Sequence, residues 1–237
     1  MERITKHKYG PVAVEAAKRV MIELIRLLGE YQNDIVIIGG WVPDLLMPGQ
    51  GHIGSTDIDI ALDHRVLQDP GYESIRRRLI GRGYTQDERQ PFIFWRTVNI
   101  KETEVVVEVD LLAAEYEGTG RKHRTQKVQD IRARTVRGCD LALEKPVELK
   151  LTGETPSGGI DTVSVRVAAI VPFLVMKSMS LRSRIKEKDS YDIWLCLRYY
   201  PDVSTGIEVI AGEFQPYLEN RLVSEALEIL DGKFAST

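Results

Sequence analysis

This sequence has few cysteines and no long apolar run, and it carries no excess of positive charge. Cys139 and Cys196 are the only two cysteines among 237 residues, and they lie far apart without metal-ligand spacing. The sequence therefore predicts neither a disulfide framework nor a zinc site, as is typical of the reducing cytoplasm. No window approaches 18 uninterrupted apolar residues and the start lacks a signal-peptide pattern, so we expect neither export nor membrane insertion. The net charge of −3 argues against a histone-like binder of polyanions.

The apolar periodicity predicts a mixed α/β (α+β) protein. The expected order is helix, strand, helix, strand, helix, strand, strand, at residues 11–31, 34–40, 41–47, 56–62, 69–82, 91–98 and 103–112. A Gly/Pro/Ser-rich segment at residues 152–159 precedes one short strand at 162–167, after which the pattern becomes helical. We therefore expect a mixed sheet domain over residues 1–160 and a mainly helical domain over residues 161–237.

Two aspartates interrupt the apolar strand "TDIDIAL". In a strand, residues two apart share a face, so Asp57 and Asp59 point one way while Ile58 and Ile60 point into the core. Two carboxylates this close repel unless a cation lies between them. A hard, oxygen-binding ion such as Mg²⁺ or Mn²⁺ suits them. The alternative is that these acids only face solvent at a strand end.

The strand "TEVVVEVDLL" offers a third carboxylate by the same alternation. Three of its valines share one face, which leaves Glu108 and Asp110 on the other. If this strand neighbours the first, Asp110 joins Asp57 and Asp59. Three such carboxylates bind two metal ions about 4 Å apart in enzymes that transfer phosphoryl or nucleotidyl groups.

Two further features bear on anion binding. Gly39 and Gly40 end a predicted strand directly before a helix, where backbone N–H groups can approach phosphate oxygens, although a plain tight turn gives the same pattern. Residues 121–137 hold seven Lys or Arg and one Asp. This run suits a nucleic-acid backbone, and it equally suits a solvated strand edge.

The combination of "GG", "STDIDIAL" and "VEVDLL" resembles the nucleotidyltransferase superfamily that includes DNA polymerase β. In "KSMSLRSR", Lys177 and Arg184 fall on one helical face, and "KDSYD" adds Asp189 and Asp192. This second pattern resembles the AbiEii-like branch, the toxins of type IV toxin–antitoxin systems and their MenT-like relatives. The resemblance covers about residues 35–200.

The resemblance implies a Mg²⁺- or Mn²⁺-dependent enzyme that moves a nucleoside monophosphate from an NTP to an acceptor hydroxyl. It implies that Asp57 and Asp59 bind the metal, with Asp110 as third carboxylate and Lys177 on the phosphates. The remaining residues implied at the nucleotide are Gly39, Gly40, Ser55, Arg184, Asp189 and Asp192. A tRNA 3′ end or a protein hydroxyl is the expected acceptor, and a cognate antitoxin is an expected partner.

Some positions depart from that family pattern. Ile53 occupies the position four before Asp57 where the branch often has arginine, and Trp41 occupies a position that is usually small. His52, Arg65 or a residue of the 121–137 run could supply the missing cation. Two other functions stay open, namely a small-molecule (aminoglycoside-type) nucleotidyltransferase with an acidic acceptor pocket, and a non-catalytic binding module of the same fold.

Overall fold

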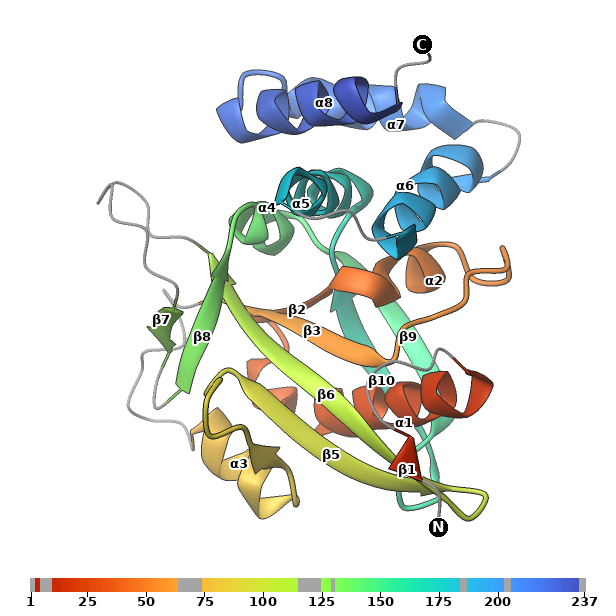
Figure 1. The fold of residues 1–237 in the computed structure, drawn as a ribbon, viewed down its shortest axis with the longest axis vertical. Helices are drawn as coiled ribbons and strands as arrows, with labels where there is room; N and C mark the ends of the chain where they lie inside the picture. The colour runs from red at the N-terminus through yellow and green to blue at the C-terminus, as the bar shows by residue number, and fades with distance from the viewer. Residues whose placement is uncertain are drawn as a thin grey trace.

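The computed structural model describes residues 3–4, 10–63, 74–114, 125–128, 131–183, 187–202 and 206–234. It confirms a mixed α/β fold built around one open sheet (Figure 1). The strands are β1 Arg3–Ile4, β2 Ile35–Ile38, β3 Asp57–Leu62, β4 Thr85–Gln86, β5 Ile93–Ile100, β6 Thr103–Ala114, β7 Thr125–Val128, β8 Ile131–Val136, β9 Val147–Glu154 and β10 Ile160–Val167.

The helices are α1 Pro11–Leu27, α2 Val42–Leu46, α3 Ile75–Gly81, α4 Cys139–Glu144, α5 Ile170–Ser183, α6 Glu187–Tyr199, α7 Gly206–Phe214 and α8 Arg221–Phe234. Short 3₁₀ turns cover Gly29–Tyr31, Gly39–Trp41 and Gln215–Tyr217. Every helix and strand expected before residue 115 is present, although α3 is shorter than predicted and residues 69–73 lie outside the described part. No helix in the described ranges is long and apolar enough to span a bilayer.

The sheet has the strand order β4-β5-β6-β3-β2-β10-β9, with β1 and β8 also paired to β6. Helix α1 packs across one face of this sheet, while α5, α6, α7 and α8 gather beyond one end of it (Figure 1). The centre of the sheet is mixed: β3 runs antiparallel to β2 and parallel to β6. The mixed pairing places the strand with the two aspartates in the middle of the sheet.

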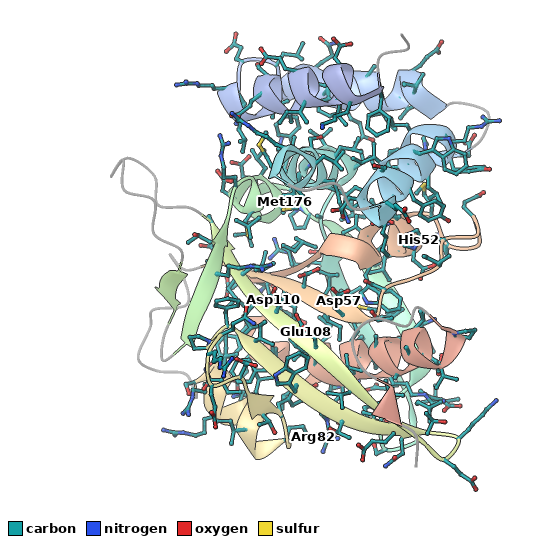
Figure 2. All side chains as sticks on the ribbon, in the orientation of Figure 1. His52, Asp57, Arg82, Glu108, Asp110 and Met176 are labelled. Carbon is teal, nitrogen blue, oxygen red and sulfur yellow. The ribbon has the colours of Figure 1, made fainter. Side chains whose placement is uncertain are left out.

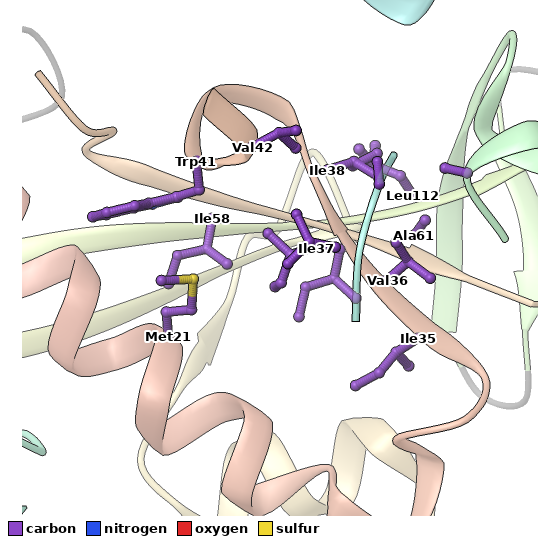
Figure 3. Packing of buried hydrophobic residues seen from close by; sticks show 14 of the residues in the cluster. Met21, Ile35, Val36, Ile37, Ile38, Trp41, Val42, Ile58, Ala61 and Leu112 are labelled. Carbon is purple, nitrogen blue, oxygen red and sulfur yellow. The ribbon is translucent and has the colours of Figure 1, made fainter. Parts of the chain in front are cut away.

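The core between α1 and the sheet explains the direction in which β3 faces. Met21 of α1, Ile37 of β2 and Ile58 of β3 are fully buried and pack together (Figure 3). Ile60 is buried on the same side as Ile58. Slipping the strand by one residue would place both aspartates in this apolar layer, so burial of the isoleucines fixes the opposite face for Asp57 and Asp59.

Residues 155–159 form the turn of a hairpin, whereas residues 152–154 are the end of strand β9. Strand β9 pairs antiparallel with β10 along its whole length, and the Thr155 N–H donates to the Gly159 carbonyl at 2.7 Å across the turn. Strand β10 also pairs with β2, so residues 160–167 belong to the sheet. The predicted boundary after residue 160 therefore falls inside a sheet strand, and the purely helical part begins at Ile170.

A buried glutamate connects α1 to the edge of the sheet. Glu23 is 4% exposed, and its carboxylate accepts from Arg82 at 2.8 Å and from Arg96 at 2.8 Å. Burial and the charge of Glu23 raise the pKa of the neighbouring Tyr84 hydroxyl well above its usual range. A single helix residue thus binds the end of α3 and strand β5.

We expect Glu23→Ala to lower the free energy of unfolding by about 2–4 kcal/mol, since it breaks a buried ion pair whose arginines are partly exposed. Glu15→Ala is the matched control, because Glu15 lies on the same helix and forms an exposed i,i+4 pair with Arg19. That control should cost less than about 0.5 kcal/mol. Urea denaturation measures both. Equal losses in the two variants would contradict a special role for Glu23.

Candidate active site

The carboxylates of β3 and β6 face one another across adjacent parallel strands. Asp57 pairs with Glu108 and Asp59 pairs with Asp110 in the register of the sheet. Register partners on neighbouring strands lie about 4.8 Å apart, and residues two apart along a strand about 6.6 Å. Figure 2 shows Asp57, Glu108 and Asp110 together near the middle of the molecule. The predicted neighbourhood of Asp57, Asp59 and Asp110 is confirmed, and Glu108 adds a fourth carboxylate that the sequence analysis placed on this face.

The carboxylates are short of neutralising charge. Glu108 is 8% and Asp110 5% exposed. Burial, followed by the charges of Asp57 and Asp110, raises the pKa of Asp59 well above its usual range, and the positive charges of Arg134 and Lys177 oppose this only in part. The donor set consists of carboxylate oxygens, which hard divalent cations prefer. The chemistry of these residues therefore fits Mg²⁺ or Mn²⁺, and an added cation would relieve their repulsion.

The glycine turn fits closely against these acids. Gly39 has φ +72°, and a Cβ built on it would lie 1.9 Å from Asp59 Oδ2. A Cβ on Gly40 would lie 2.5 Å from Ser55 Oγ and 3.0 Å from Lys188 Nζ. Both positions therefore require glycine, because the polar side chains of the site occupy the space that any larger residue would need.

The strand start is fixed by two hydrogen bonds. Ser55 Oγ donates to Asp57 Oδ1 at 2.5 Å, and the buried Trp41 Nε1 donates to the Asp57 carbonyl at 2.9 Å. The tryptophan that departs from the family pattern thus connects the glycine turn to β3. Ile53, the other departure, is half exposed to solvent.

On the helical side, the two predicted aspartates bind lysines. Lys177 Nζ donates to Asp189 at 2.7 Å and to Asp192 at 2.8 Å. Lys188 Nζ contacts both oxygens of Asp192 at 3.2 and 3.1 Å. Burial would raise the pKa of Asp192, but the hydrogen bond from His52 and the two lysine charges lower it to about 2. Burial would also lower the pKa of Lys177, whereas Asp192 and Asp189 raise it above its usual value.

His52 connects the loop before β3 to α6. Its Nδ1 accepts from the Gly54 N–H at 3.0 Å, which requires the proton of the neutral ring to sit on Nε2. Nε2 then donates to Asp192 Oδ1 at 3.0 Å. Tyr191 stacks on the imidazole with ring centroids 5.9 Å apart. His52 therefore hydrogen-bonds to Asp192, and it helps to orient the carboxylate that binds Lys177 and Lys188.

A pocket lies between the sheet and the helices. Its volume is about 160 Å³, and its lining combines acids, cations and apolar side chains: Ile38, Gly39, Gly40, Ser55, Asp57, Asp59, Leu112, Arg134, Val136, Phe173, Met176, Lys177, Ser180, Lys188 and Asp189. The pocket thus brings together residues from both predicted regions. Arg134 and Lys188 were absent from the predicted site, although Lys188 directly precedes the motif aspartate.

Other predictions fall partly outside the described residues. Arg184 and Arg65 lie there, as do residues 121–124 and 129–130 of the basic run. Of that run, Arg137 binds Glu225 at 2.7 Å, and Arg134 binds Asp110 at 2.7 Å. These two arginines thus form ion pairs within the protein, and Arg134 is the member of the run that lines the pocket.

In the described part of the chain, no three His, Cys, Asp or Glu side chains already converge as a preformed metal site, so the fit of Asp57, Asp59 and Asp110 to a metal ion rests on their carboxylate chemistry and their strand register. Neither protein-family models nor curated proteins give a match to this chain. The geometry and chemistry of the pocket are therefore the features that indicate a function.

Asp59→Asn should stabilise the metal-free protein, and the gain should grow with pH. A raised carboxyl pKa means that the folded state binds more protons than the unfolded state. The free energy of unfolding of the wild type therefore falls as the pH rises through the raised pKa of Asp59, and the Asn variant avoids this loss. We expect a melting temperature about 2–4 °C higher than wild type at pH 8, and a smaller difference at pH 5. Calorimetry with a chelator present measures both. A gain that is equal at the two pH values would contradict the raised pKa of Asp59 as its cause.

Proposed function

We propose that this protein is a metal-dependent nucleotidyltransferase that moves a nucleoside monophosphate from an NTP to an acceptor hydroxyl and releases pyrophosphate. The observation that carries the proposal is the register of β3 and β6, which aligns Asp59 with Asp110 beside Asp57, next to a pocket that also contains lysines and a glycine turn. A site with acids for a metal and cations for phosphates matches the two needs of this chemistry.

The size of the pocket indicates which part of the nucleotide it receives. A volume of about 160 Å³ is below the roughly 300–1,000 Å³ of pockets that enclose a drug-sized ligand. We therefore assign the phosphate end of the NTP to the pocket and the base to its mouth. The backbone of Gly39 and Gly40 would lie along the phosphates, in keeping with the close approach that glycine allows.

The residues have separate tasks in this proposal. Asp57 and Asp59 would hold Mg²⁺ or Mn²⁺, and the ion would supply positive charge that offsets the negative charge of the phosphates. Asp110 joins them and takes the proton of the acceptor hydroxyl. Lys177 and Lys188 offset negative charge on the departing pyrophosphate. Asp189 and Asp192 orient those lysines, and their own burial keeps the lysine positions fixed.

An RNA end or a protein hydroxyl is the acceptor that we propose, in keeping with the AbiEii-like pattern of Lys177, Asp189 and Asp192. A toxin with a cognate antitoxin is the corresponding biological role. A cationic small-molecule acceptor would need acidic groups beyond those that bind the metal, whereas Asp57, Asp59 and Asp189 of the pocket lining are matched there by Arg134, Lys177 and Lys188.

Divalent metal alone should raise the melting temperature of the wild type, because a ligand that binds only the folded state stabilises it. At a concentration about 100 times the dissociation constant, the gain corresponds to about 2.7 kcal/mol. Asp57→Asn should lose most of this rise. Asp44→Asn is the control, since Asp44 lies on α2 outside the pocket lining. An equal metal-induced rise in Asp57→Asn and wild type would refute the metal site.

Lys177→Ala should reduce nucleotidyl transfer by two or more orders of magnitude, as expected when a cation that offsets transition-state charge is removed. The assay combines protein, Mg²⁺, each labelled NTP in turn and total RNA, and a gel then separates labelled RNA from labelled protein. Asp57→Ala is the blank, and the exposed Lys233→Ala is the matched control. Transfer by Lys177→Ala at the wild-type level would exclude the helical side from the chemistry.

A further inference from the structure

Arg134 differs from the other cations of the pocket in the partner that it binds. Lys177 and Lys188 bind Asp192, on the helical side. Arg134 lies on β8, which pairs with β6, and its guanidinium binds Asp110 Oδ2 at 2.7 Å. Its partner therefore belongs to the carboxylate group itself. The arginine contacts an oxygen of the kind that a metal ion would use.

Arg134 belongs to the pocket lining, whereas its partner Asp110 does not. Arg134 lines the pocket together with Asp57 and Asp59, and its side chain is 44% exposed, whereas the side chain of Asp110 is 7% exposed. The guanidinium also lies over the Phe92 ring, 5.6 Å from its centroid. Arg134 thus connects the buried third carboxylate to the pocket lining.

The pairing is well suited to exchange. The guanidinium of Arg134 is partly solvated, so it can leave Asp110 for water or another anion, provided that a different cation then neutralises the buried carboxylate. A divalent cation that replaces Arg134 also interacts with Asp57 and Asp59, since Asp59 is the register partner of Asp110 on the adjacent strand and Asp57 lies two residues away on the same face. Arginine keeps its charge at every physiological pH, and its planar fork matches phosphate oxygens. Displacement would therefore produce a free cation at the pocket wall.

We propose that Asp110 exchanges Arg134 for a divalent cation, and that the released guanidinium then binds an anionic oxygen of the ligand that arrives with the metal. This inference depends on the proposed function, because it assumes that the carboxylates bind a metal. The arginine keeps Asp110 neutralised before the metal arrives, and it adds to anion binding afterwards. Metal binding and anion binding are thus coupled through one side chain.

The test is the affinity for Mn²⁺ without nucleotide, measured by titration calorimetry. Arg134→Gln removes the competitor, so its affinity for Mn²⁺ should rise at least fivefold over wild type. Arg137→Gln is the matched control, because Arg137 lies close by in the chain and binds Glu225 instead. Its affinity for Mn²⁺ should equal that of wild type. An unchanged or weaker affinity in Arg134→Gln would overturn the exchange.

A double-mutant cycle separates direct exchange from the general field of the arginine charge. In an Asp110→Asn background, Arg134→Gln should alter the affinity for Mn²⁺ by less than twofold. An effect as large as in the wild-type background would overturn the exchange through Asp110. With saturating Mg²⁺, Arg134→Gln should bind a non-hydrolysable NTP analogue at least tenfold more weakly than wild type, and equal binding would overturn the second half of the proposal.

The same data separate this inference from the proposed function. If wild type binds Mn²⁺ and Arg134→Gln binds it no more tightly, the exchange fails while the metal site stands. If neither protein binds Mn²⁺ at any accessible concentration, the metal-dependent function fails and the exchange fails with it.

Discussion

Repulsion among the carboxylates of β3 and β6 is the constraint on which the pocket depends. The core packing of Ile58 and Ile60 fixes the face that carries Asp57 and Asp59, and the parallel register adds Glu108 and Asp110. Holding these like charges close together lowers the free energy of unfolding. Other features of the pocket compensate for that cost, through Arg134 at Asp110, a serine hydroxyl at Asp57 and the lysines beyond.

The helical side has the opposite balance. There, Asp192 is surrounded by Lys177, Lys188 and His52, so its negative charge is stabilised. The pKa of Lys177 is raised by Asp192 and Asp189, whereas burial lowers the pKa of Lys188. The pocket therefore has an acidic wall on the sheet and, on α5 and α6, a wall that presents Lys177 and Lys188 with one acid, Asp189. A ligand that carries phosphates and a divalent cation complements both walls at once, whereas a neutral ligand would complement neither.

Alternation along two strands was enough to predict which acids share a face, because valine and isoleucine leave little doubt about the buried side. The pairing of β3 with β6 could only be expected conditionally, since parallel pairing depends on the connection through β5. Arg134 and Lys188 were missed because each reaches the pocket through tertiary contacts between distant segments. The composition of residues 152–159 predicts a connection between two regions, because glycine, proline and serine are typical of a linker and of a hairpin turn alike.

The contact between Gly39 and Asp59 has a consequence for sequence variation. A side chain at residue 39 would occupy the position of the Asp59 carboxylate, so the two residues can change only together. A chain of this fold that carries alanine or serine at residue 39 would need a different position for the Asp59 carboxylate, whereas a side chain at residue 40 would meet Ser55 and Lys188 instead. Glycine at residue 39 is therefore a marker for an intact pair of carboxylates at residues 57 and 59.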